Sequence, residues 1–333
     1  MEGTIGIGVI GCGAIAQEAH LPNYANHPQA RLVAVADTDK DRAQEVAKRF
    51  DVPHVYTDYT ELLARDDIQA VSVCTPNYLH APQTIAAAAA GKHILCEKPM
   101  AITLEEANAM ITAVEEAGVQ LMVGFTHRFH YFNQKARELI ADNAIGRPYT
   151  IRVRFAHRGP YESWVAKSDW FFNTAQAGGG AVLDMGIHAL DIARYVLNQE
   201  IRTVEANLAT LNLDIQAEDT AIISLEFLNG SLGYIETGWH SHPGPLGLEI
   251  YGSGGTLIVD YTTPIRLWTP DKGWQELKDF PAGGGWPAEV HYFVNALLAG
   301  EEITPNGYDG LISVRAALAA YDSHRLGVRV SLA

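Results

Sequence analysis

The segment Ala177–Asp191, AGGGAVLDMGIHALD, holds the residues best suited to proton transfer. Asp184, His188 and Asp191 stand at positions i, i+4 and i+7, which share one face of a helix. A carboxylate one turn from an imidazole is the pairing that acid–base catalysis needs. The preceding glycines, 178–180, allow the backbone to pass close to a bulky group such as a ligand. Taken alone, the segment fits a catalytic site, a metal site or a capped helix packed on a core.

A second group of residues is suited to binding a dinucleotide. Residues 11–16 read GCGAIA, a GxGxxA pattern that follows an apolar run. Gly11 allows a tight turn, and Gly13 lets a pyrophosphate approach the backbone. Asp37 ends the next apolar run, about 20 residues further on, where a carboxylate binds ribose hydroxyls. Because Asp37 and Asp39 would repel a 2′-phosphate, the pattern predicts NAD, with NADP less favoured; a helix N-cap is the other interpretation of Asp37.

Polar residues also follow two later apolar runs. Thr75 and Asn77 lie in the sequence CTPN, and Glu97 and Lys98 lie in CEKP. Ligands of open α/β sheets bind beyond the carboxyl ends of the strands, so these residues are candidates for cofactor contact. Thr75 and Asn77 would equally suit a turn or a cap. Lys98 is held at a strand end, and partial desolvation there would lower its pKa and suit it to proton transfer or substrate binding.

Two kinds of sheet are expected to position these residues. In the first 125 residues, apolar runs alternate with helical patterns, which indicates a parallel sheet covered on both faces. These runs are 5–10, 32–36, 70–74, 93–96 and 121–124. From about 147, polar and apolar residues alternate, and Asn229-Gly230 predicts a hairpin. The fold class is therefore α/β, with an NAD-binding Rossmann domain at 1–125 and a second domain at 126–333 that contains an antiparallel or mixed sheet.

The composition excludes several classes of partner. The 333 residues include 24 Lys and Arg against 39 Asp and Glu, a net charge of −15, so binding to nucleic acid or to an anionic membrane is not expected. We see no signal peptide and no apolar run of transmembrane length. Cys12, Cys74 and Cys96 form no CxxC pair, which favours buried thiols in a reducing, cytoplasmic compartment.

The order of these motifs resembles the Gfo/Idh/MocA oxidoreductases, a family that includes glucose–fructose oxidoreductase and inositol dehydrogenase. The matching segments are GVIGCGAIA, VAVADTD, CTPNYLH, ILCEKPM, GFTHRF and AGGGAVLDMGIHALD, followed by the ending YDGLISVRAALAAYDSHRLGVRV. The combination of EKP with GGGxxxDxGxHxxD is the specific part. The resemblance implies a Rossmann domain, then an α/β domain with an open, mainly antiparallel sheet through which homodimers or homotetramers form. Tyr131 departs from the pattern, since many members have proline two residues after the phenylalanine.

The resemblance also implies roles for individual residues. Lys98, Asp184 and His188 would form the catalytic group, Glu97 and Lys98 would contact the nicotinamide, and the Lys98–Pro99 bond would be cis. The expected cofactor contacts lie in the glycine loop and at the strand ends: Gly11, Gly13, Ala14, Ile15, Asp37, Thr75, Asn77, His80, Glu97 and Lys98. The family usually needs no metal, although the ligand types of Asp184, His188 and Asp191 leave one as an alternative.

The expected reaction is the reversible oxidation of a secondary alcohol on a sugar, a sugar derivative or a cyclitol. His188 would accept the hydroxyl proton, Asp184 would orient the imidazole or bind a neighbouring hydroxyl, and Lys98 would hold the reacting oxygen. Asp191 is expected to support the site. Candidate substrate contacts are polar or aromatic residues of the second half: His127, Arg128, Tyr161, Trp164 and Trp170. For the tryptophans, an ordinary place in the core is the alternative.

Three other functions stay open. Some relatives cleave glycosides by transient oxidation of the sugar with retained NAD, and others bind dinucleotide to regulate partner proteins without catalysis. The presence of Lys98, Asp184 and His188 argues against the regulatory function. A non-sugar substrate, such as a dihydrodiol or a tetrapyrrole, is the third possibility, which the fold alone does not separate.

Overall fold

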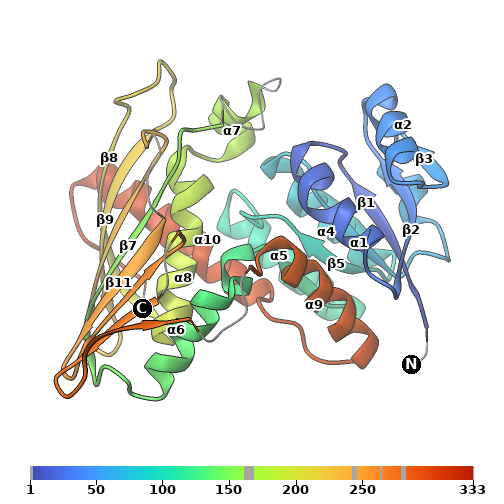
Figure 1. Cartoon of the computed structure of the whole chain (residues 1–333). Helices are drawn as coiled ribbons and strands as arrows, with labels where there is room; N and C mark the ends of the chain where they lie inside the picture. Colours follow the sequence, from blue (N-terminus) through green and yellow to red (C-terminus); the bar gives the residue numbers. More distant parts are fainter. Residues whose placement is uncertain (1–2, 161–168, 242–245, 263–264, 279–282, 333) are drawn as a thin grey trace. The chain divides into compact units, whose positions relative to one another are not determined.

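The computed structural model describes residues 3–160, 169–241, 246–262, 265–278 and 283–332 (Figure 1). The chain forms two compact units. The first contains Met1–Thr126 and Trp286–Ile312, and the second contains His127–Gly285 and Ser313–Ala333. The division differs from the expected one in that Trp286–Ile312 belongs to the first unit.

The first unit is built on a six-stranded parallel sheet. Its strands are β1 (Ile5–Ile10), β2 (Ala30–Ala36), β3 (His54–Tyr56), β4 (Ala70–Val73), β5 (His93–Cys96) and β6 (Leu121–Val123). They are arranged in the order β3-β2-β1-β4-β5-β6, which is the Rossmann order. The strands are short, apolar and mostly buried, which explains why they stand out as continuous apolar runs in the sequence. Because the strands are parallel, all the residues that follow them lie at one edge of the sheet.

Helices connect the strands of the first unit. They are η1 (Ala16–His20, a π-helix), α1 (Leu21–Ala25), α2 (Lys40–Arg49), α3 (Tyr59–Leu63), η2 (Asn77–Leu79), α4 (His80–Ala89), α5 (Leu104–Ala117) and α9 (Trp286–Ala299). Helix α5 begins at a capped turn, in which the Thr103 hydroxyl accepts the Glu106 N–H at 3.1 Å. Helix α9 packs against α1 and η1, which explains why this late segment belongs to the first unit.

The second unit is built on a nine-stranded mixed sheet. Its strands are β7 (Pro148–Ala156), β8 (Ile201–Ala209), β9 (Thr220–Phe227), β10 (Leu232–Gly238), β11 (Gly247–Gly252), β12 (Thr256–Asp260), β13 (Ile265–Thr269), β14 (Gly273–Leu277) and β15 (Val330–Ser331). The order is β14-β13-β12-β11-β7-β10-β9-β8-β15. Among the described strands of this second sheet, only β7 and β10 pair in parallel. The hairpin predicted at Asn229-Gly230 joins β9 to β10.

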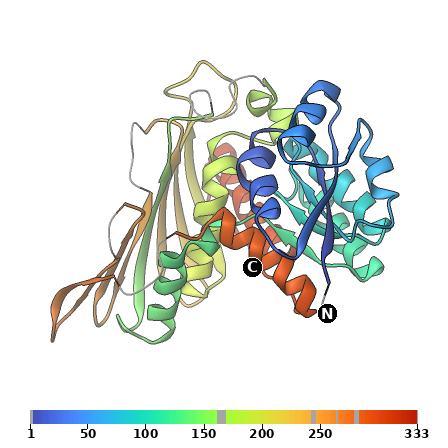
Figure 2. The same cartoon turned by 45° about the vertical axis from the view of Figure 1, so that its right-hand side comes forward.

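Helices pack on one face of this second sheet (Figures 1 and 2). The helical elements of the unit are η3 (Thr126–Phe129), α6 (Tyr131–Ala141), η4 (Asp169–Phe172), α7 (Thr174–Ala177), η5 (Val182–Gly186, a π-helix), α8 (Ile187–Leu197) and most of α10 (Gly307–Leu326). Helix α8 contacts β7 and β10, and α6 contacts α8 and β12. The strand residues beneath them are buried, whereas alternate residues on the opposite face are exposed. Every helix in the described ranges is too short or too polar to span a membrane.

Candidate active site

The glycine loop after β1 leaves room for a ligand beside its backbone. Gly11 has φ of 90°, and a Cβ atom there would lie 2.7 Å from the carbonyl oxygen of Cys74, so only glycine fits. At Gly13, by contrast, a Cβ atom would meet no heavy atom within 4 Å. The next residues, Ala14 and Ile15, are half-buried. This combination of a tight turn and open space fits the close approach of a pyrophosphate.

Asp37 lies beside this loop and has a partner that the sequence analysis missed. Its Oδ2 accepts the Cys12 N–H at 2.8 Å, and the Arg42 guanidinium binds both carboxylate oxygens, at 3.0 and 2.7 Å. Although burial raises the pKa of Asp37, the hydrogen bonds from Arg42, Asp39 and Cys12 hold it below its ordinary value. Asp37 is therefore ionised at neutral pH. Its partner Arg42 lies five residues further along the chain and is not part of the dinucleotide-binding pattern, so the pattern alone does not identify it.

The loops after β4 and β5 are tied together by His80. Its Nδ1 lies 2.7 Å from the carbonyl oxygen of Pro99, and its Nε2 lies 2.7 Å from that of Thr75. The side chain is 1% exposed, and burial lowers its pKa. Both ring nitrogens thus contact the backbone and hold the two loops together, while the cofactor contact expected of His80 stays a prediction. Thr75 binds Gln83, and Asn77 is buried at the start of η2.

Glu97 is fixed by a buried polar network beneath the sheet edge. Its Oε1 lies 2.9 Å from His20 Nε2, and His20 Nδ1 lies 3.0 Å from the hydroxyl of Ser72. The Glu97 carboxylate also packs against Gly124, where a Cβ atom would lie 3.2 Å away. Burial raises the pKa of Glu97, but His20 and Lys98 outweigh this effect and hold it low. Since the Lys98 N–H donates to Glu97 at 3.2 Å, the backbone that carries Lys98 is held in place; the Lys98–Pro99 bond is cis, as expected.

In the second unit, the three glycines of the AGGG segment have a different explanation from the expected one. Gly178 ends α7 with φ of 85°. A side chain at Gly179 would overlap the hydroxyl of Tyr321, and one at Gly180 would overlap the carbonyl oxygen of Glu218. The glycines are therefore required by close packing inside the unit, and the structure gives no need to invoke a bulky ligand.

Asp184 lies in the π-helix η5 and accepts hydrogen bonds from residues that the sequence analysis did not identify. The indole N–H of Trp239 donates to its Oδ2 at 2.8 Å, and His157 Nε2 lies 3.2 Å from the same atom. The Gly159 N–H donates to His157 Nδ1 at 2.8 Å, so the proton of the neutral ring is on Nε2 and points to Asp184. The carboxylate is thus held by two donors, in a π-helical turn of the kind that is frequent at functional sites.

His188, one turn further on, packs against a second imidazole. Its ring centroid lies 4.6 Å from that of His127, edge to face. His127 Nδ1 is 2.8 Å from the hydroxyl of Tyr261, which also receives the amide N–H of Asn133 at 2.8 Å. The hydroxyl of Tyr261 therefore holds both the amide of Asn133 and the ring of His127 in place. The expected substrate residue His127 is therefore brought next to the expected catalytic residue His188.

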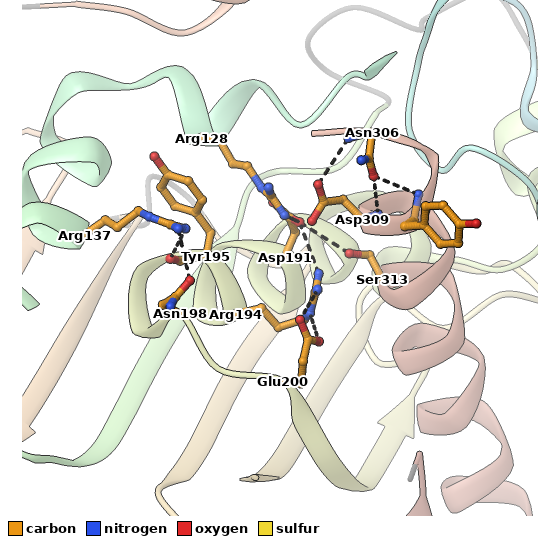
Figure 3. Close-up of polar contacts among 11 residues, drawn as sticks. Arg128, Arg137, Asp191, Arg194, Tyr195, Asn198, Glu200, Asn306, Asp309 and Ser313 are labelled. Carbon is orange, nitrogen blue, oxygen red and sulfur yellow. Dashed lines mark hydrogen bonds and ion pairs between the residues drawn. The ribbon is translucent and has the colours of Figure 1, made fainter. Parts of the chain in front are cut away.

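Asp191 binds Arg128 deep inside the unit (Figure 3). The Arg128 Nε and Nη2 atoms lie 2.7 and 2.6 Å from the two carboxylate oxygens, and the hydroxyl of Ser313 lies 3.4 Å away. Asp191 is 1% exposed and Arg128 is 7% exposed. Arg194 stands 3.8 Å from the same carboxylate. Asp191 and Arg128 thus form a buried ion pair, and the substrate contact expected of Arg128 stays a prediction.

Of the remaining residues expected to contact substrate, only Trp170 lies within the described part of the chain. Trp170 is half-buried and packs on Phe171, whose ring lies 5.8 Å from that of Trp239. Tyr161 and Trp164 lie outside the described residues. Among the residues that the structure describes, no three His, Cys, Asp or Glu side chains are grouped closely enough to hold a metal ion.

The sheet topology explains how His157 and Trp239, which the sequence analysis missed, come to lie near each other. His157 directly follows β7 and Trp239 directly follows β10, and these are the two strands that pair in parallel. Their carboxyl ends therefore lie side by side, as in the first unit. The sequence does not reveal this pairing, because the two strands are far apart in the chain.

The sequence of the chain matches known families along most of its length. Residues 5–125 match the family described as "Oxidoreductase family, NAD-binding Rossmann fold", and residues 133–258 match the GFO/IDH/MocA C-terminal domain. The chain is similar to myo-inositol 2-dehydrogenase of Thermotoga maritima, with 30% identity over 328 residues that cover 95% of each protein.

Solved structures show the same architecture. An oxidoreductase domain protein from Kribbella flavida superimposes with a TM-score of 0.91 at 28% identity, covering 99% of this chain and 100% of that one. Levoglucosan dehydrogenase in complex with NADH and levoglucosan superimposes with a TM-score of 0.88 at 28% identity, covering 99% of both chains.

Proposed function

Because the chain belongs to the GFO/IDH/MocA oxidoreductase family, we propose that it reversibly oxidises a secondary alcohol of a sugar, a sugar derivative or a cyclitol. The observation that carries the proposal is the setting of Asp184 and His188, with the carboxylate fixed by two donors and the imidazole beside His127. Relatives named as dehydrogenases of myo-inositol and levoglucosan support this substrate class.

The first unit is an NAD-binding Rossmann domain, and the residues at its sheet edge fit that cofactor. Gly13 offers open space for the pyrophosphate, and the ionised Asp37 suits the ribose hydroxyls. NAD, when bound, supplies the acceptor for the hydride. NAD is favoured over NADP because a 2′-phosphate would be repelled by Asp37 and Asp39, although Arg42 offsets part of this repulsion.

In the proposed reaction, side chains of the second unit accept the hydroxyl proton of the substrate and stabilise the group that carries it. His188 accepts the hydroxyl proton of the substrate, since the ordinary pKa of histidine lies near neutrality. Asp184 is held by its bonds from Trp239 and His157, and it binds a substrate hydroxyl or stabilises the protonated ring of His188. Lys98 of the first unit would bind the reacting oxygen and stabilise its developing negative charge.

The test combines a substrate panel with two variants. We expect at least one sugar or cyclitol to reduce NAD, with NADP used less well. We expect His188→Ala and Lys98→Ala each to lower turnover at least about 100-fold while NAD affinity, measured by fluorescence titration, changes little. His324→Ala, an exposed histidine of the same unit, serves as the control and should keep full turnover.

Near-normal turnover in either variant would refute the assignment of that residue. A preference for NADP would refute our interpretation of Asp37. Release of an aglycone from a glycoside, with retained NAD and no net NADH, would indicate the glycoside hydrolase alternative.

We also propose that copies of the chain assemble through the open face of the second sheet, as a homodimer or homotetramer. The strand register places Tyr234, Tyr251, Trp268 and Trp274 on this face, and all four side chains are exposed. An exposed aromatic patch of this kind is typical of an interface. A cytoplasmic location remains a prediction from the cysteines.

A further inference from the structure

Glu218 lies just before β9 and contacts the start of the helix that carries Asp184. Its carboxylate accepts the N–H of Gly180 at 3.1 Å and the N–H of Val182 at 2.9 Å. Its own carbonyl oxygen accepts the N–H between them, that of Ala181, at 3.0 Å. Three consecutive N–H groups at a helix start, where no preceding helical carbonyl can reach them, therefore all bind one residue.

Tyr321, from α10, completes the arrangement. Its hydroxyl donates to Glu218 Oε1 at 2.8 Å and accepts the Gly180 N–H at 3.1 Å. The same hydroxyl occupies the space where a side chain at Gly179 would stand. The triple glycine is thus shaped to admit Glu218 and Tyr321, and a larger residue at 179 or 180 would push them away.

The neighbouring residue, Asp219, connects the same point of the chain to the carboxylate of Asp184. The backbone carbonyl of Asp219 accepts the Trp239 N–H at 2.7 Å. The indole N–H of Trp239 then donates to Asp184 at 2.8 Å. The dipeptide Glu218-Asp219 therefore holds the helix start directly and holds the Asp184 side chain through Trp239.

We propose that Glu218 and Tyr321 are positioning residues, which clamp the first turn of the helix and so fix where Asp184 and His188 stand. This inference rests on the proposed function for its kinetic consequence. The Asp184 N–H already bonds to the Gly180 carbonyl at 3.1 Å, so a shift of Gly180 would move Asp184 directly. Errors of about 1 Å in a reacting group lower rates by up to about 100-fold.

The experiment compares Glu218→Ala, Glu218→Gln and Tyr321→Phe with the parent protein. Hydrogen exchange, followed by mass spectrometry, measures the protection of residues 178–186. Steady-state kinetics measures kcat and KM, and fluorescence titration measures NAD affinity. Thr103→Ala is the matched control, because it removes the N-cap of α5 in the first unit without touching this turn.

We expect Glu218→Ala to speed exchange in 178–186 and to lower kcat, each about tenfold or more, with NAD affinity unchanged. Glu218→Gln keeps an acceptor oxygen in the Oε1 position and should restore most of kcat. Tyr321→Phe, which keeps its shape but loses the hydroxyl, should lower kcat by about three- to tenfold.

Three results would overturn the inference: unchanged exchange in Glu218→Ala, faster exchange with an unchanged kcat, or an equal fall of kcat in Thr103→Ala. A parent protein that oxidises no member of the substrate panel would refute the proposed function instead. The exchange result would still decide whether Glu218 holds the turn.

Discussion

At the scale of single residues, Asp184 and Asp191 share one predicted helix face, and their spacing alone does not say how their surroundings differ. The structure gives them different partners. Asp184 is held by Trp239 and His157, which donate single hydrogen bonds, whereas Asp191 is neutralised by the guanidinium of Arg128. The bonding partners therefore distinguish the two carboxylates: Asp184 is suited to chemistry, whereas Asp191 helps to hold the fold together.

This difference predicts the effect of removing Asp191. Asp191→Ala breaks a buried ion pair in which the guanidinium of Arg128 binds both carboxylate oxygens, so we expect the free energy of unfolding to fall by about 3–5 kcal/mol. Urea denaturation measures the change. Asp322→Ala, which breaks the exposed pair with Arg325, is the control and should have a far smaller effect. A loss for Asp191→Ala no larger than that of the control would contradict the structural role.

Both glycine motifs could be located from the sequence, because each motif is local; the roles of their residues in the site stay predictions. His157, Trp239 and Arg42 could not. His157 and Trp239 reach the site only through the parallel pairing of two distant strands, and Arg42 matters only because Asp37 faces it.

At the scale of elements, the short strand start at Glu218-Asp219 combines two carboxylates with opposite pKa shifts. Burial raises the pKa of Glu218. Burial also acts on Asp219, but the N–H groups of Leu211, Leu213 and Asn212 outweigh it and hold its pKa below the ordinary value. One carboxylate therefore costs stability when it ionises, while the other contributes stability.

The signs give a testable pH dependence. The stabilisation from Asp219 is present above its unfolded pKa and is lost as the pH falls through its lower folded pKa. We expect Asp219→Asn to lower the free energy of unfolding by about 1–3 kcal/mol at pH 7, with the deficit shrinking below about pH 4. Urea denaturation at several pH values measures this.

Glu218→Gln should change stability with pH in the opposite direction from Asp219→Asn. The raised pKa of Glu218 means that its contribution is present at acid pH and is lost as the pH rises through the folded pKa. The parent protein should therefore lose stability relative to this variant as the pH rises. For the preceding prediction, a loss of unfolding free energy in Asp219→Asn that is the same at every pH would contradict the stabilising role of ionised Asp219.

The elements of the first unit follow from the sequence, since buried parallel strands form continuous apolar runs between helices with clear caps. The strand order of the second sheet does not, because alternation predicts strands without saying which of them pair. Its β9–β10 hairpin is the exception, being local.

At the scale of the whole molecule, the proposed assembly through the open face of the second sheet predicts how substitutions there change the oligomeric mass. Tyr234→Arg combined with Tyr251→Arg places like charges on this face near Arg152, so we expect the proposed assembly to dissociate to monomers. Light scattering coupled to gel filtration measures the mass. Tyr308→Arg, at an exposed aromatic of the first unit, is the control. An unchanged mass of the double variant would exclude this face as the interface.

The assignment of Trp286–Ile312 to the first unit has a consequence for how the protein is made. Helix α9 packs against α1 and η1, and η1 follows the glycine loop. The strands of the Rossmann sheet are therefore synthesised well before Trp286–Ile312. Until that segment follows, the buried side chains of α1 lack the helix that packs on them.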